Sequence, residues 1–205
     1  MPGCLAAQFL NAMTQNHEVS NSIIKKEADS ILFEKGLIDI LSSIGTPYVH
    51  GSYLLDLMTW RDLDIYLQVD NISISDFFIL GEKICQSFAP VKMSFRNEFI
   101  GKTQGLPYGL YWGVYLGNER AGAWKIDIWT VNESECQNLL QYCHRIKQKL
   151  TPEFSQRILE IKSTCWRDAE FRRAYSSSDI YKAVLDNNVS TVEEFKKYIK
   201  LNPAG

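Results

Sequence analysis

The sequence predicts an α/β (α+β) fold, in which a small mixed sheet has helices on one side and a helical region follows it. Short segments with a two-residue apolar period lie between residues 47 and 131, as expected for strands. Helix-type segments alternate with them in this part of the chain, and only helix-type segments follow residue 133. A length of 205 residues suits one domain, or one domain with a helical appendage.

This change of pattern gives the domain organisation that we expect. Residues 1–19 form an N-terminal segment, residues 20–132 a mixed domain, and residues 133–205 a helical region. The boundary near residue 132 rests on the change from mixed to purely helical pattern.

The first expected helix covers residues 20–45, where apolar residues recur at helical spacing (Ile24, Ala28, Ile31, Ile38 and Leu41). Gly45 and Pro47 are typical of a helix end. A short strand then leads to Gly51, and residues 53–58 predict a short helix. Gly51 and Ser52 therefore lie where a strand turns into a helix.

The next segment, residues 62–69, predicts a strand with two different faces. Leu63, Ile65 and Leu67 point to one side, while Asp62 and Asp64 point to the other. Two aspartates on the same side of a short apolar strand call for a chemical reason.

Residues 74–88 predict a second helix, which begins at Ser75 and ends before Pro90. Three strand-like runs follow, at residues 91–100, 108–117 and 123–131, with glycine-containing turns between them. These runs would complete the sheet.

Four helices are expected in the last third of the chain, at residues 134–150, 151–168, 176–188 and 190–200. Thr151 has the position of an N-cap, and proline follows it at the first helical position. Ser190 and Glu193 have the spacing of a capping box.

Composition excludes several classes of protein. The formal net charge is -2, from 22 basic and 24 acidic residues, so broad electrostatic binding of nucleic acid is not indicated. No apolar run is long enough to span a membrane, and the N-terminus lacks the basic residues of a secretory signal. Five cysteines without a Cys-x-x-Cys pair suggest reduced thiols and a cytoplasmic location.

Asp62 and Asp64 lie two residues apart on one strand face, where their charges would repel each other unless a cation neutralised them. Mg²⁺ takes oxygen ligands and is commonly held by one or two carboxylates together with substrate phosphates. Asp127 lies in an otherwise apolar strand, with Ile126 and Ile128 facing the opposite way. We expect Asp127 to face the same cavity as the other two. The alternative is a structural ion pair between Asp127 and Lys125 or an arginine.

The Gly-Ser pair at residues 51 and 52 suits a phosphate. A helix start presents free N–H groups, Gly51 allows close approach of the backbone, and Ser52 adds a hydroxyl donor. A phosphate cradle beside paired aspartates predicts a triphosphate site. The alternative is an ordinary strand-to-helix turn in which Ser52 caps the helix.

At these residues the sequence resembles the nucleotidyltransferase superfamily, which has the polymerase-β-like fold. The resemblance consists of Gly51-Ser52, nine further residues, then "DLDIYL", and a later strand aspartate in "KIDIW". It covers roughly residues 20–131, and within the superfamily it points to the small bacterial enzymes that modify antibiotics or other small acceptors.

The resemblance implies that Asp62, Asp64 and Asp127 bind two Mg²⁺ ions, or Mn²⁺ in their place, and that Asp127 helps to deprotonate the acceptor. Gly51 and Ser52 would hold the β- and γ-phosphates. The implied reaction moves a nucleoside monophosphate from an NTP to a hydroxyl of a small-molecule or protein acceptor and releases pyrophosphate. Two basic residues near the aspartates, Arg61 and Lys125, are candidate nucleotide contacts. Alternatively, Arg61 simply neutralises acid and Lys125 is a solvated edge lysine.

Two other functions remain open at this point. One is a non-catalytic nucleotide-binding protein, or an interaction module such as half of a toxin–antitoxin pair. An idle cluster of three aspartates would be destabilising, which argues against it. The other is addition of nucleotides to RNA, against which the acidic balance of the chain counts. A nucleic-acid partner is therefore not expected.

Overall fold

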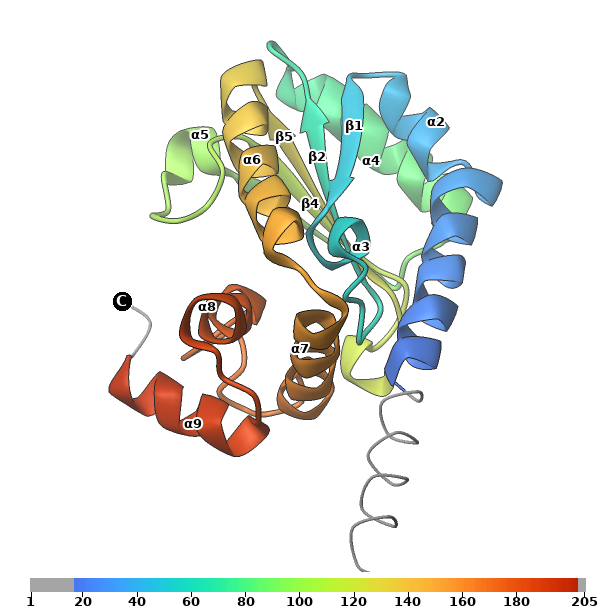
Figure 1. The fold of residues 1–205 in the computed structure, drawn as a ribbon. Coiled ribbons are helices and arrows are strands. Elements are labelled where there is room, and N and C mark those ends of the chain that lie inside the picture. The colour runs from blue at the N-terminus through green and yellow to red at the C-terminus, as the bar shows by residue number, and fades with distance from the viewer. Residues whose placement is uncertain (1–16, 203–205) are drawn as a thin grey trace, which may run out of the picture. The chain divides into compact units, whose positions relative to one another are not determined.

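A computed structural model describes residues 17–202, which form two compact units (Figure 1). One unit consists of Lys25–Asp56 and Arg61–His144 and contains the sheet. The other consists of the described residues up to Ile24, the short segment Leu57–Trp60, and the chain from Arg145 onward. The predicted N-terminal segment, residues 1–19, lies mostly outside the described residues. The predicted boundary near residue 132 stays a prediction.

The first predicted helix is two helices in the structure. Residues 17–29 are α-helical, and the π-helical turn η1 (Ser30–Glu34) continues them. The chain then breaks at Gly36, whose φ of 73° lies in the left-handed region, before α2 (Leu37–Ser42) begins. This break changes the helical phase, so Leu37 is fully buried and Ile38 only partly.

Five strands form one mixed sheet in the order β1-β2-β5-β4-β3. Their bounds are β1 (Thr46–His50), β2 (Asp62–Gln68), β3 (Lys92–Asn97), β4 (Leu110–Tyr115) and β5 (Lys125–Val131). Only β2 and β5 pair in parallel, and the other three pairings are antiparallel. The predicted mixed sheet is thus confirmed, and its central strands are the two that contain the aspartates.

The two faces of β2 differ as its sequence predicted. Leu63, Ile65 and Leu67 are fully buried, while the intervening positions, which include Asp62 and Asp64, are half-buried. Strand β5 repeats this alternation, with Ile126 and Ile128 fully buried. Because β2 and β5 run in parallel and in register, the polar positions of the two strands lie on the same face.

The apolar face of the sheet packs against α4 (Ile74–Phe88). The indole N–H of Trp112 on β4 donates to the Phe77 carbonyl at 3.0 Å, and the two rings stack at 5.7 Å between centroids. Helix α4 begins directly after its N-cap Ser73, whose hydroxyl accepts from the Asp76 N–H. The predicted start at Ser75 is corrected, because Ser73 is the residue with the extended backbone that a cap requires.

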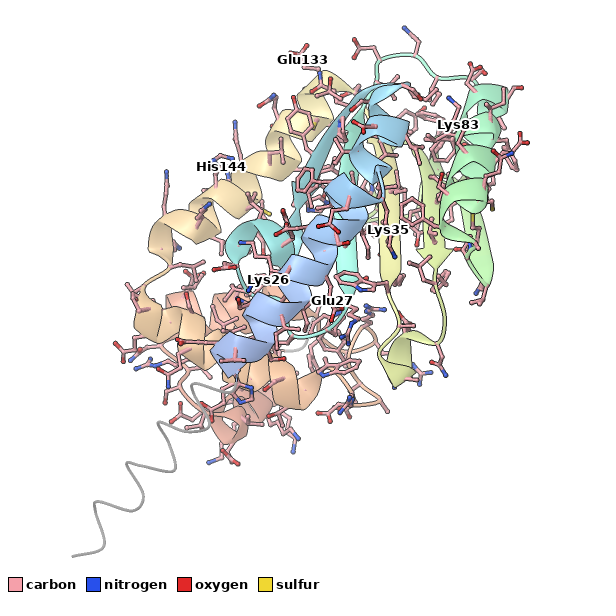
Figure 2. All side chains as sticks on the ribbon, turned by 90° about the vertical axis from the view of Figure 1, so that its right-hand side faces the viewer. Lys26, Glu27, Lys35, Lys83, Glu133 and His144 are labelled. Atoms are coloured by element: carbon pink, nitrogen blue, oxygen red, sulfur yellow. The ribbon has the colours of Figure 1, made fainter. Side chains whose placement is uncertain are left out.

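Helix α6 (Glu133–Lys149) lies on the other side of the sheet from α4 (Figure 2), where the labels Lys83 on α4 and His144 on α6 mark the two sides. Its buried cysteines Cys136 and Cys143 lie near Tyr66 of β2. Helices therefore cover both faces of the sheet, whereas the sequence analysis expected helices on one side only. Two short pieces, α5 (Glu98–Gly101) and the 3₁₀ turn η2 (Glu119–Ala121), complete this unit.

The helical unit contains α7 (Pro152–Cys165), α8 (Ser177–Asn187) and α9 (Val192–Leu201). Thr151 caps α7 as predicted, since its hydroxyl accepts from the Phe154 N–H. The cap of α9 is Thr191 and not Ser190: the Thr191 hydroxyl accepts from the Glu194 N–H, and Glu194 accepts in turn from Ser190. The predicted capping box is therefore displaced by one residue.

Lys162 of α7 is fully buried inside this helical unit. Its ammonium donates to the Leu57 carbonyl at 2.6 Å and to the Tyr181 hydroxyl at 3.2 Å, and it lies 4.7 Å from the centroid of the Trp60 ring. The segment Leu57–Trp60, which connects α3 (Gly51–Leu55) to β2, is thus packed against helices from the last third of the chain.

Among the described residues, no helix combines the length and apolar character needed to cross a bilayer. Four cysteines of this part of the chain are present as free thiols (Cys85, Cys136, Cys143 and Cys165). The cytoplasmic location stays a prediction.

Candidate functional site

Three aspartates meet on the polar face of the central strand pair. Asp62 and Asp64 come from β2, and Asp127 of β5 lies directly opposite Asp64 in the parallel register. One carboxylate oxygen of each residue lies within 4.8 Å of the corresponding oxygens of the other two. The structure therefore brings together the three carboxylates that the sequence analysis singled out.

Burial and repulsion make this cluster costly without a cation. Burial raises the pKa of Asp127, and the negative charge of Asp62 raises it further, against the opposing effects of Lys125 and Tyr111. Three carboxylates with oxygen atoms at this spacing are a donor set that suits a hard divalent cation such as Mg²⁺. The residues present thus fit the metal that the resemblance implies.

The Asp127 carboxylate is held on both of its oxygens. Lys125 of the same strand forms an ion pair with Oδ2 at 2.6 Å, and the Tyr111 hydroxyl donates to Oδ1 at 2.6 Å. The Lys125 and Asp127 side chains are only 11% and 16% exposed, so solvent screens this pair weakly. The ion pair that the sequence analysis set out as an alternative therefore exists, alongside the convergence of the three carboxylates.

The Gly-Ser turn lies against the second aspartate. Strand β1 ends at His50, and Gly51 opens α3 with a φ of 62°. A Cβ atom on Gly51 would lie 2.6 Å from Oδ2 of Asp64, closer than real Cβ contacts occur. Gly51 thus provides both the left-handed turn and the space that the Asp64 carboxylate fills.

The Cys143 thiol of α6 lies near the backbone N–H of Gly51. Burial raises the pKa of this thiol, and the nearby Gly51 N–H opposes the effect in part. The sequence analysis did not anticipate that α6 would reach this turn, because nothing in the pattern of residues 134–150 indicates which side of the sheet the helix covers.

Arg61 is not brought to the carboxylates. Its guanidinium binds both carboxylate oxygens of Glu27, at 2.5 and 2.7 Å, and the pKa of Glu27 is lowered chiefly by this bond. Glu27 belongs to the helix of residues 17–29, where Figure 2 labels it. The Trp124 indole N–H donates to the same carboxylate at 3.3 Å. In this structure Arg61 therefore joins the start of β2 to that helix.

Two further residues lie near the aspartates: Tyr111, which the sequence analysis missed, and His50, which adjoins Gly51 and for which strand alternation favoured a core position. Tyr111 reaches Asp127 from β4, a relation that depends on the register between the two strands and leaves no pattern in the sequence. His50 pairs with Asp64 in the register of β1 and β2 and stacks on Tyr66 with 3.6 Å between ring centroids. The buried Nε2 of His50 makes no hydrogen bond to the described part of the chain.

His50 should make the protein sensitive to acid. Burial lowers the pKa of His50 from 6.5 to about 3, so between these values the unfolded chain binds a proton that the folded chain does not. Stability from this group is complete above pH 6.5 and falls as the pH drops toward 3. We expect a loss of about 1.6 kcal/mol between pH 6.5 and 5. His50→Phe keeps the stacked ring and should remove this part of the pH dependence.

Urea unfolding of both proteins at pH 6.5 and 5 measures the difference, and other titrating groups cancel in the comparison. If the wild type and His50→Phe lose the same free energy of unfolding on acidification, His50 is not held neutral by burial.

Comparison with known proteins gives matches in structure but not in sequence. No protein-family model and no curated protein matches the chain. Solved structures do match. One, described as a cytoplasmic RNA terminal U-transferase, has a TM-score of 0.57 and 14% identity, and the match covers 87% of this chain and 50% of that one.

Two further structures are of Cid1. One is described as an RNA terminal uridylyl transferase, with a TM-score of 0.54, 14% identity, and coverage of 87% of this chain and 54% of that one. The other is described as a poly(U) polymerase with Mg and 3′-dATP bound, with a TM-score of 0.56, 17% identity, and coverage of 85% and 54%. The chain thus spans about half the length of these proteins.

The order of the motifs on the strands agrees with the sequence resemblance. The Gly-Ser turn lies between β1 and α3, the aspartate pair on β2 and the third aspartate on the neighbouring β5. The chain therefore has the fold of the nucleotidyltransferase superfamily, which its sequence resembles.

Proposed function

We propose that this protein is a metal-dependent nucleotidyltransferase, which moves a nucleoside monophosphate from an NTP to an acceptor hydroxyl and releases pyrophosphate. The observation that carries the proposal is the convergence of Asp62, Asp64 and Asp127, with oxygen atoms within 4.8 Å of one another. The likeness to solved nucleotidyltransferases supports it through the fold.

Each candidate site residue has a defined part in this proposal. Asp62, Asp64 and Asp127 hold divalent cations, two Mg²⁺ ions or Mn²⁺ in their place, as the resemblance implies. When bound, such cations neutralise the charge that develops on the attacking and leaving oxygens. Asp127 is also the proposed acceptor of the proton from the acceptor hydroxyl, as the resemblance implies.

Gly51 and Ser52 are the proposed contacts of the β- and γ-phosphates. Lys125 is a further proposed contact, and it would leave its 2.6 Å ion pair with Asp127 when a cation neutralises that carboxylate. A nucleotide contact of Arg61 stays a prediction from the sequence and would require exchange of its Glu27 partner. Catalysis in this arrangement is positioning and charge neutralisation, as in other phosphoryl transfer.

Two classes of acceptor are proposed, and a different observation supports each. The similar solved structures are described as acting on RNA, which supports an RNA 3′-hydroxyl as the acceptor. A small-molecule or protein hydroxyl, as the sequence resemblance suggests, is supported by a net charge of -2, since RNA binding usually comes with a basic surplus. The fold is compatible with both, because the acceptor of such enzymes is chosen outside the aspartate cluster.

We expect the purified protein to release pyrophosphate from at least one labelled NTP in the presence of Mg²⁺ and a suitable acceptor. The panel contains RNA oligonucleotides with free and blocked 3′ ends, aminoglycosides, lincosamides and the protein itself. Mass spectrometry of the acceptor shows the added nucleotide, and the blocked 3′ end is the matched control for RNA. Mg²⁺-dependent NTP binding without transfer to any member would favour the non-catalytic alternative.

A further inference from the structure

The Asp127 carboxylate has a second polar neighbour besides Lys125, and the surroundings of this contact are built in detail. The Tyr111 hydroxyl donates to Asp127 Oδ1 at 2.6 Å from the adjacent strand β4. Tyr111 is only 8% exposed.

Gly113 provides the space for this hydroxyl. It lies opposite Asp127 in the β4–β5 register, two residues beyond Tyr111 on the same face of β4. A Cβ atom on Gly113 would overlap the Tyr111 hydroxyl and would lie 2.8 Å from the Ser94 hydroxyl. The Tyr111 side chain therefore crosses the face of β4 over a residue without a side chain and reaches the carboxylate diagonally.

Trp129 holds the ring of Tyr111 from the other side. It pairs with Tyr111 in the β4–β5 register, and the two ring centroids are 4.6 Å apart. Contact with Trp129, the space above Gly113 and the hydrogen bond to Asp127 thus all constrain the position of the ring. A carboxylate oxygen has a second lone pair, so Asp127 Oδ1 can accept from Tyr111 and still ligate a cation.

We infer that Tyr111, given its space by Gly113, is a positioning residue that fixes the Asp127 carboxylate for cation binding. This inference rests on the proposed function and extends it to residues that neither the sequence resemblance nor the comparisons single out. Hydrogen-bond partners of metal-ligating carboxylates typically change metal affinity or activity by about 10- to 100-fold when they are removed. Tyr111 acts through Asp127 and does not itself ligate the cation.

Binding of Mn²⁺ to the full-length protein tests the inference without any need for substrate. The free Mn²⁺ signal in electron paramagnetic resonance gives the dissociation constant for the wild type and for Tyr111→Phe. We expect Tyr111→Phe, which removes one oxygen and keeps the ring against Trp129, to weaken Mn²⁺ binding about 10- to 100-fold.

Tyr175→Phe is the matched control. Tyr175 is 6% exposed and its hydroxyl donates to the Asp168 carboxylate at 3.0 Å, in the helical unit. It should leave the Mn²⁺ dissociation constant unchanged, although both variants lose a buried tyrosine–aspartate hydrogen bond. A purely structural role of Tyr111 would lower the melting temperature and leave the dissociation constant of the folded protein as it is.

Gly113→Ala is a second way to disturb the hydrogen bond between Tyr111 and Asp127. Its methyl group displaces the Tyr111 hydroxyl, so we expect weaker Mn²⁺ binding, and no further weakening when Tyr111→Phe is added. Additive effects of the two substitutions, or wild-type affinity in Tyr111→Phe, would overturn the inference. If Asp64→Asn still prevents Mn²⁺ binding in that case, the proposed function stands. Failure of the wild type to bind Mn²⁺ overturns both.

Discussion

Asp64→Asn should lower the proposed Mg²⁺-dependent nucleotide transfer by about a thousandfold, because a cation ligand contributes several kcal/mol to the transition state and about 4 kcal/mol corresponds to that factor. Asn keeps the shape of the side chain, and Asp64 lies beside Asp62 and opposite Asp127. Removal of one negative charge from this cluster should leave the melting temperature of the metal-free protein unchanged or slightly raised. Steady-state release of pyrophosphate, measured together with thermal unfolding, checks both parts.

Asp70→Asn is the control for this result. Asp70 is an exposed residue two positions beyond the end of β2, and its substitution removes the same charge outside the cluster. We expect this variant to transfer nucleotide at the rate of the wild type. Normal turnover in Asp64→Asn would remove the basis for assigning the cluster to cation binding.

Gly51→Ala should lower nucleotide transfer by about a hundredfold. The added methyl group would lie 2.6 Å from Asp64 Oδ2, so the carboxylate or the turn has to move. A displacement of about 1 Å at a reacting group is enough for a hundredfold loss. The left-handed backbone at residue 51 would also destabilise the fold by about 1–2 kcal/mol. Pyrophosphate release and urea unfolding measure the two effects separately.

Gly36→Ala separates backbone strain from crowding. Gly36 has a similar φ of 73°, but a Cβ atom there meets nothing nearer than Asp39 Oδ2 at 3.9 Å. We expect the two alanine variants to lose similar free energies of unfolding, and only Gly51→Ala to lose activity. Equal activities in both variants would show that the space around Asp64 has no part in the reaction.

The central strands of the sheet could be predicted from the sequence because each has one apolar and one polar face. In β2 and β5 this alternation identified both the strands and the side on which the aspartates lie. The Gly-Ser turn was predictable for a similar local reason, since a glycine at a strand end accepts a left-handed φ. The elements that carry the candidate site were therefore the ones that the sequence predicted best.

Features that depend on distant parts of the chain could not be predicted in this way. Glu27 binds Arg61 from 34 residues away, which reassigns an arginine that adjoins the aspartate pair. The hydroxyl of Tyr111 reaches Asp127 through a strand register that no local pattern encodes. Small shifts of helix ends, such as the cap at Ser73, reflect competition among neighbouring serines that differ little in sequence context.

The burial of Lys162 against the Leu57 carbonyl affects how the chain can be divided. Leu57 and Met58, which are almost completely buried, lie between the Gly-Ser turn and the aspartate pair in sequence, yet their compact unit is the one that contains α7. A fragment that stops at residue 132 would keep both motifs and lose the lysine that secures the stretch of backbone joining them. A division of this protein by position in the sequence therefore differs from a division by which residues pack together in one core.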